Sequence, residues 1–69
     1  MNIIERLNSQ EQNLNSCLRS DEVKNHRYLV LHMLRENFKA QLYILCHNRV
    51  KRKHLLKNWR EIISFFGPA

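Results

Sequence analysis

The residues with the clearest chemical meaning lie in one basic segment, residues 47–60 (HNRVKRKHLLKNWR), which has six Lys or Arg, two His and no carboxylate. The acidic residues lie mostly elsewhere. Residues 1–22 contain four carboxylates and two cationic side chains, a net charge of −2, whereas residues 23–69 have a net charge of +8. Because the overall charge of +6 is divided so unevenly, we expect the second part of the chain to meet a polyanionic partner.

Metal and catalytic chemistry find little support in the residue types available. Cys46, His47 and His54 are the nearest metal-ligand types, but the sequence has no Cys-x-x-Cys pair and no matched second pair of histidines. After residue 22 the only carboxylates are Glu36 and Glu61, which do not make a convincing acid–base pair. We therefore expect no metal, no other cofactor and no enzymatic activity.

The cysteine content and the start of the chain favour a reducing compartment inside the cell, and the cytoplasm in particular. Two cysteines, Cys17 and Cys46, do not form a disulfide framework, and the start MNIIERLN is polar by its fifth residue, unlike a signal peptide. No apolar run approaches the roughly 20 residues that a membrane span requires.

Two other interpretations of the basic segment stay open. Four cations within residues 49–53 resemble a nuclear-import signal centred on Lys51-Arg52-Lys53, which would place the chain in the nucleus. The same cations, with Trp59 and two phenylalanines close behind, would also suit an anionic membrane surface.

The placement of glycine and proline in the sequence predicts an all-α fold. Gly67 and Pro68 are the only Gly and Pro in the chain, and both stand at its very end, so nothing in the interior marks a hairpin turn between strands. We predict a single helical domain over residues 1–69, with helices at about 2–18, 21–53 and 55–66.

The first predicted helix is amphipathic. Apolar residues recur at three-to-four spacing, with Glu11 as the one polar residue inside the stripe. The members of this stripe are Ile4, Leu7, Leu14 and Leu18. Ser20, followed by Asp21 and Glu22, has the character of an N-cap and predicts the start of the second helix.

The second predicted helix is too long for one small domain to cover. More than thirty residues at the helical rise would span about 45 Å, of which the first helix covers about half. We therefore expect a homodimer, most simply a dimeric helical bundle. A bend near residues 53–55 would let the third helix return and bury Trp59. The expected core and dimer contacts are Leu31, Leu34, Phe38, Leu42, Leu45, Trp59, Ile63 and Phe66.

The polar side of the long predicted helix carries cations along one line, which would span about 37 Å. The residues on this line are Tyr28, His32, Arg35, Lys39, Cys46, Arg49 and Lys53. Cations spread along a rigid helix match a nucleic-acid backbone, because each neutralised phosphate releases counterions. We expect nucleic-acid contacts from Arg35, Lys39, Arg49, Lys51, Arg52, Lys53 and Lys57.

Double-stranded RNA is the preferred nucleic acid in this interpretation. Its shallow minor groove presents 2′-hydroxyls and phosphates to a protein that recognises shape, and the sequence shows no helix-turn-helix spacing for reading bases. Two alternatives remain. The basic stripe is equally consistent with a solvated helix face, and the third helix could instead serve as a protein-interaction module that docks an acidic protein partner.

The order of the elements and one segment support a family resemblance. Within the 69 residues a first helix, a polar turn, a basic second helix and a short third helix follow one another, and Leu55–Gly67 (LLKNWREIISFFG) has a Leu-Leu pair, a nearby lysine and a closing glycine. In these features the chain resembles the small double-stranded-RNA-binding silencing suppressors of insect nodaviruses, although Trp59 stands where that family tends to have a proline. The resemblance implies a dimer that lies along an RNA duplex and shields it from host silencing nucleases.

Overall fold

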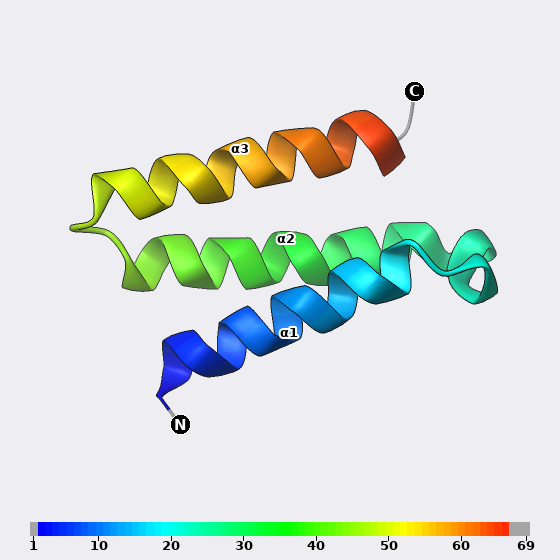
Figure 1. Cartoon of the computed structure of the whole chain (residues 1–69), viewed down its shortest axis with the longest axis horizontal. Coiled ribbons are helices and arrows are strands. Elements are labelled where there is room, and N and C mark those ends of the chain that lie inside the picture. The colour runs from blue at the N-terminus through cyan, green and yellow to red at the C-terminus, as the bar shows by residue number, and fades with distance from the viewer. Residues whose placement is uncertain (1, 67–69) are drawn as a thin grey trace.

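The computed structural model describes residues 2–66 and contains three α-helices and one 3₁₀ helix, without strands in that range (Figure 1). The predicted all-α class is confirmed. The elements are α1 (Ile3–Leu18), η1 (Asp21–His26), α2 (Arg27–Ile44) and α3 (Arg49–Phe66). The central helix α2 runs antiparallel to both α1 and α3 (Figure 1).

Side-chain caps explain where the first elements begin. The Asn2 side chain accepts a hydrogen bond from the Glu5 backbone N–H at 2.9 Å, and Glu5 places a carboxylate in the first turn of α1. The predicted cap at Ser20 is also confirmed, since its hydroxyl accepts from the Glu22 N–H at 3.3 Å. The element that Ser20 opens is the short η1, however, and α-helical geometry resumes only at Arg27.

The predicted continuous helix over residues 21–53 is wrong. The α2 helix ends at Ile44, and a turn at residues 45–48 separates it from α3. Within this turn the Asn48 N–H donates to the Leu45 carbonyl at 2.9 Å, and the Asn48 side chain caps α3 by accepting from the Lys51 N–H at 3.1 Å. Asn48 is a favourable N-cap residue whose signal the apolar periodicity concealed.

Burial of apolar side chains explains why the chain folds back at this turn. Leu55 and Ile62 of α3 are buried in the core that α2 supplies. The Trp59 ring meets Phe38 of α2 edge-on, with ring centroids 5.8 Å apart and planes at 80°. A returning third helix was expected, but the reversal comes before Arg49 rather than at residues 53–55, so α3 is longer than predicted.

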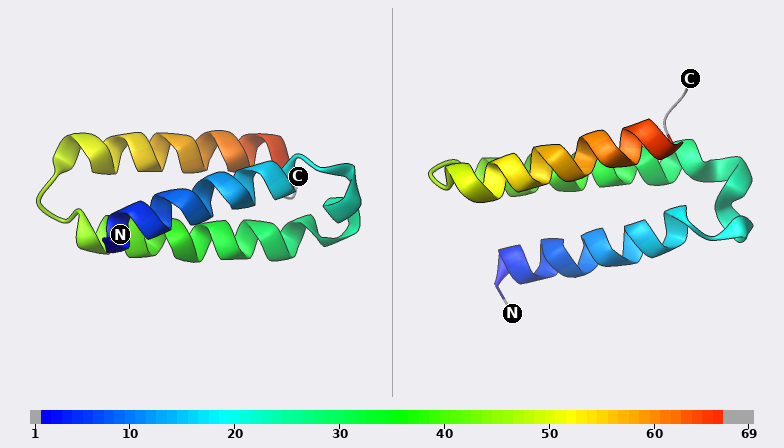
Figure 2. Two further views of the ribbon diagram at one scale, coloured as in Figure 1. Left: turned by 60° about the horizontal axis from the view of Figure 1, so that its bottom comes forward. Right: turned by 45° about the horizontal axis from the view of Figure 1, so that its top comes forward.

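The three helices form a broad and shallow molecule, with Cα extents of 36 × 28 × 13 Å (Figure 2). Both α1 and α3 pack on α2, but no Cα of α1 lies within 8 Å of one in α3. One side of α2 is open to solvent and includes Tyr28, Arg35 and Lys39.

The core lies along α2 and collects apolar residues from all three helices. Its buried members are Leu14, Leu18, Val30, Leu31, Leu34, Phe38, Leu55 and Ile62. Of the predicted core residues, Leu31, Leu34 and Phe38 are buried, and four others are partly buried against the core. Those four are Leu42, Leu45, Trp59 and Phe66. The assignment of Ile63 to the core of the chain is wrong, because it is 37% exposed while its neighbour Ile62 points inward.

A polar network joins α1 to α2. Asn37 and Gln41 of α2 are both buried. The Asn37 amide donates to the Leu7 carbonyl at 3.0 Å and to the Gln10 side chain at 2.7 Å. The Gln41 amide donates to Asn37 at 2.6 Å and to the Glu11 carboxylate at 2.8 Å. Glu11, the one polar residue within the apolar stripe, is therefore there to satisfy a buried amide.

Arg27, at the start of α2, contacts both neighbouring helices. Its Nε donates to the Leu18 carbonyl at the end of α1, at 3.2 Å. Its guanidinium also lies over the Phe66 ring of α3, 5.3 Å from the centroid. One side chain of α2 thus contacts the last residues of both neighbouring helices.

Truncation of the most buried leucine tests this packing. Leu34 is 0% exposed, so Leu34→Ala should lower the free energy of unfolding by about 2–5 kcal/mol. Leu56→Ala is the matched control, because Leu56 is 40% exposed and should cost well under half as much. Urea unfolding followed by far-UV circular dichroism measures both, and equal losses would contradict the packing described.

The cap at Asn48 makes a second prediction. Asn48→Ala should remove the hydrogen bond to the Lys51 N–H and destabilise the chain by about 0.5–2 kcal/mol. Asn48→Ser, which keeps a capping oxygen, should recover most of that loss. A continuous helix through residues 45–48 would instead gain helicity and stability from Asn48→Ala, because alanine is the better interior residue.

Candidate nucleic-acid interface

The structure divides the predicted nucleic-acid-binding cations between two helices. Two of them, Arg35 and Lys39, lie on α2, and the other five lie on α3. Those five are Arg49, Lys51, Arg52, Lys53 and Lys57. All seven are exposed. The predicted single line of about 37 Å is wrong beyond Lys39, because the turn at residues 45–48 takes Arg49 and Lys53 onto a separate helix.

The reversal of the chain brings together cations that are distant in sequence. Lys39 and Arg52 line the same hollow beside the turn between α2 and α3. Arg35 and Lys39 line the adjoining groove, whose apolar floor includes Leu55 and Trp59. Arg35, Lys39 and Arg52 therefore form one cationic cluster over the α2–α3 seam, which we call the seam cluster.

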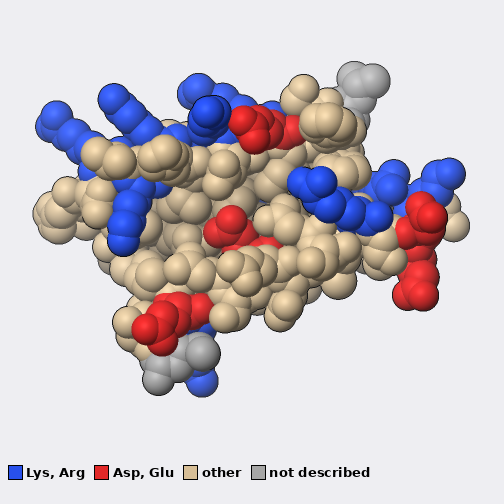
Figure 3. Space-filling view, in the orientation of Figure 1, with Lys and Arg blue, Asp and Glu red and all other residues tan. Residues whose placement is uncertain are grey.

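A second group of cations follows the outer side of α3. Four residues at spacings of four, four and three fall on one face of the helix. They are Arg49, Lys53, Lys57 and Arg60, and we call them the outer stripe. This face lies away from the buried Leu55 and Ile62, and Figure 3 shows blue atoms gathering over α3 and projecting from it. Lys51 is exposed on another side of the same helix.

Arg60 was not among the predicted contacts. Its spacing of three from Lys57 is the signal that places it on the outer stripe. Tyr43 was also left out of the predicted contacts. It lines the hollow between Lys39 and Arg52 at the end of α2, a position that depends on the chain reversal.

The cations of this surface form few ion pairs, although Glu61 lines a shallow hollow with Lys57 and Arg60. Within residues 2–66 the one ion pair is that of Lys39 with Glu36, at 3.6 Å. Both side chains are more than half exposed, and such pairs contribute about 0–1 kcal/mol. The cations of the seam cluster and the outer stripe are therefore largely available to an anionic partner.

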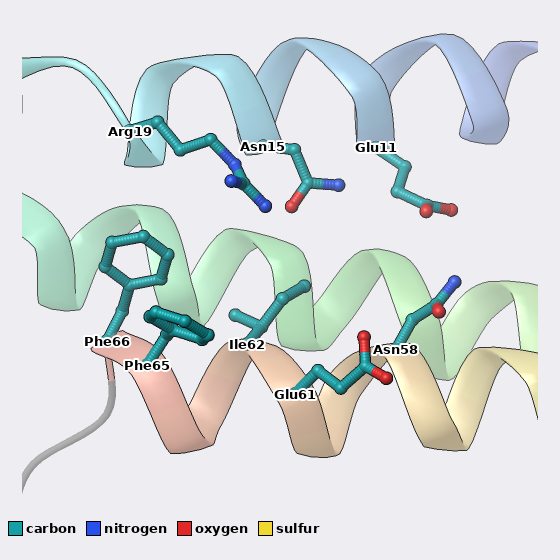
Figure 4. Close-up of a pocket in the computed structure, with 8 residues that line it drawn as sticks. All are labelled: Glu11, Asn15, Arg19, Asn58, Glu61, Ile62, Phe65 and Phe66. Carbon is teal, nitrogen blue, oxygen red and sulfur yellow. The ribbon is translucent and has the colours of Figure 1, made fainter.

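A groove between α1 and α3 differs in character from the basic surface (Figure 4). It encloses about 350 Å³. Charges of both signs line it, since Arg19 and Glu11 come from α1 and Glu61 from α3. Asn15, Asn58 and the side chains of Ile62, Phe65 and Phe66 complete its walls. Because opposite charges face this space, the groove does not extend the basic surface.

The structure bears on the metal and membrane expectations only for the part of the chain that it describes. Across residues 2–66, His, Cys and carboxylate side chains do not gather in groups of three or more that could hold a metal ion. Cys17 and Cys46 are free and exposed. None of the described helices is both long enough and apolar enough to cross a membrane.

Comparisons with other proteins add no relative to this description. No protein-family model, curated protein or solved structure matches the chain. What the basic surface does is therefore inferred from its own residues and their arrangement.

Proposed function

We propose that this chain binds nucleic acid by charge and shape, without reading base sequence, and that double-stranded RNA is its preferred form. The seam cluster carries the proposal. The chain reversal brings Arg52 to the hollow that Lys39 lines, and Arg35 lines the adjoining groove with Lys39. Within residues 2–66 the one ion pair among these cations is that of Lys39 with Glu36. Cations held close together on rigid helices neutralise neighbouring phosphates and release their counterions.

The shape of the basic surface favours recognition of a duplex by its form rather than by its base sequence. The seam cluster and the outer stripe lie on exposed surfaces of two antiparallel helices, each about 27 Å long at the helical rise. Such a surface suits phosphates and 2′-hydroxyls across a shallow minor groove. The resemblance to nodaviral silencing suppressors agrees with this preference and extends the proposal to shielding RNA duplexes from silencing nucleases.

We further propose that the binding form is a homodimer. Four residues of α2 at spacings of four, seven and four form an apolar strip on the flank near α1, and three of them are a third to a half exposed. The strip consists of Leu29, Met33, Ala40 and Ile44. Exposure of these apolar side chains to water is unfavourable, so burying the strip against a second copy of the chain would stabilise a dimer.

The exposed area supports a second copy. A folded monomer of 8.4 kDa exposes about 4,600 Å² on average, whereas this chain exposes 5599 Å². The excess is comparable with the roughly 800 Å² that each partner buries in an interface of standard size.

The position of the strip also suits the proposed activity. At 100° per residue it lies about a third of a turn around α2 from Arg35 and Lys39. A two-fold axis that pairs two α2 helices antiparallel through their strips would keep both pairs of cations on one side of the dimer. The dimer would then present a doubled basic face to one duplex.

The alternative of a protein-interaction module is less well supported. That function would need the apolar stripe of the third helix to be free for a partner. Leu55 and Ile62 are buried against the rest of the chain, and Trp59 packs on Phe38. A partner could reach Leu56 and Ile63, which are 40% and 37% exposed, but it would have to displace α3 to reach Leu55 and Ile62.

Paired charge removals test the proposed binding. Lys39→Ala with Arg52→Ala should weaken binding to all duplex sequences alike and reduce the slope of log affinity against log salt by about 2, one unit for each lost phosphate contact. Mobility shift with duplex RNA, duplex DNA and single strands over a salt series makes the measurement, with duplex RNA expected to bind most tightly.

Arg6→Ala with Lys24→Ala is the matched control, because it removes the same charge from exposed positions outside the basic surface. This control should leave the salt dependence nearly unchanged. Equal effects of the two double variants would show that net charge alone drives binding. The absence of salt-sensitive binding in the original chain would overturn the proposal.

The homodimer makes its own prediction. Sedimentation equilibrium should give twice the chain mass of 8.4 kDa, and Leu29→Ser with Met33→Ser should give a monomer at the same concentration. Phe65→Ser is the control, since this exposed apolar residue lies on α3, away from the strip. A monomeric original chain, or equal weakening by both changes, would contradict the dimer.

A further inference from the structure

Tyr43 is a large aromatic residue for which the fold gives no structural role. Its side chain is 83% exposed in the last turn of α2. Among residues 2–66 it takes no part in an aromatic pair, a cation–π contact or a side-chain hydrogen bond. By contrast, the rings of Phe38 and Trp59 contact each other where α2 packs against α3.

The surroundings of Tyr43 indicate a ligand. Lys39 from α2 and Arg52 from α3 line the same hollow as its ring. Aromatic faces stack on nucleobases, and nearby cations bind the phosphate that each base carries. An aromatic ring with a cation from each of two helices thus offers both contacts that one nucleotide requires.

The base must have a face that is free of a stacked neighbour, and an unpaired nucleotide at a strand end meets this condition best. Inside a duplex both faces of each base are covered by its stacked neighbours, so a protein ring has access only at an end or in a single-stranded segment. Tyr43 stands at the end of the exposed side of α2 that carries Arg35 and Lys39, next to the turn. A strand whose end reaches this part of the basic surface would meet Tyr43.

We propose that Tyr43, Lys39 and Arg52 form a site for the unpaired nucleotide at the end of a bound strand. The base stacks on the Tyr43 ring, and its phosphate lies between the two cations. This inference depends on the proposed nucleic-acid binding and deepens it, because it gives the chain a preference for duplexes with single-stranded overhangs over blunt ones.

Tyr28 supplies a matched control within the same helix. It is also a largely exposed tyrosine on the open side of α2, but fifteen residues earlier, about 22 Å away at the helical rise. A general effect of exposed tyrosines would appear at both positions, whereas a terminal-nucleotide site would respond only to Tyr43.

Fluorescence anisotropy with labelled RNA duplexes tests the site. The probes are a blunt duplex, the same duplex with a short 3′ overhang, and the overhang duplex with its terminal bases removed. The original chain should bind the overhang duplex about fivefold or more tightly than the blunt one. Removing the bases should abolish this preference, because the phosphates remain but the stacking partner is lost.

Substitutions then assign the preference to its residue. Tyr43→Ala should reduce the overhang preference, which is the ratio of overhang to blunt affinity, to about onefold, whereas Tyr43→Phe and Tyr28→Ala should retain it. Equal affinity of the original chain for blunt and overhang duplexes would overturn the terminal site alone, as would a preference that survives Tyr43→Ala. Failure to bind any duplex would overturn the proposed function itself, and the terminal site with it.

Discussion

The edge-on contact between Phe38 and Trp59 is the interaction on which the basic surface depends. The two rings join α2 to α3 at a centroid separation of 5.8 Å, and such pairs contribute about 0.5–1.5 kcal/mol beyond the area that they bury. Trp59 is partly buried, and the buried residues of α3 are Leu55 and Ile62. The aromatic pair acts together with these two residues to hold the returning helix, which brings Arg52 to the hollow that Lys39 lines.

The attachment of α1 has a different physical basis. Its contact with α2 is specified by buried amides, since Asn37 and Gln41 bond to three α1 residues and to each other. A shift of register would leave these groups without partners in a poorly solvated place, which costs more than the bonds contribute. With α1 fixed in this position, the apolar strip of α2 stays uncovered. The proposed dimer would bury that strip.

The separation of charge along the chain becomes a separation in space. The carboxylates of residues 1–22 belong to α1 and to η1, whereas the cations of the outer stripe belong to α3. No Cα of α1 comes within 8 Å of α3, so these acids remain away from most of the basic surface. A concentrated positive field of this kind raises the rate at which a polyanion arrives, and a dimer would extend it.

The residue pattern alone was enough to predict the fold class, the first helix and most of the core. Apolar spacing placed Leu31, Leu34 and Phe38 inward, and the cap at Ser20 was visible as a hydroxyl before two carboxylates. The Asn48 break was missed because the apolar and basic residues continue in phase across it, and periodicity reports which face a residue occupies, not whether the helix continues. Ile63 lies outside the core of the single chain for a related reason, since either of two adjacent isoleucines satisfies the stripe, while its predicted dimer contact stays a prediction.

What the sequence determined by itself is therefore local: helical character, caps, and the concentration of cations in the second part of the chain. These properties follow from residue types within a few turns of one another. The tertiary structure alone decided that Arg52 lines the same hollow as Lys39 and Tyr43. Those neighbours come from different helices, and their meeting depends on which apolar surfaces bury one another when the chain reverses at Asn48.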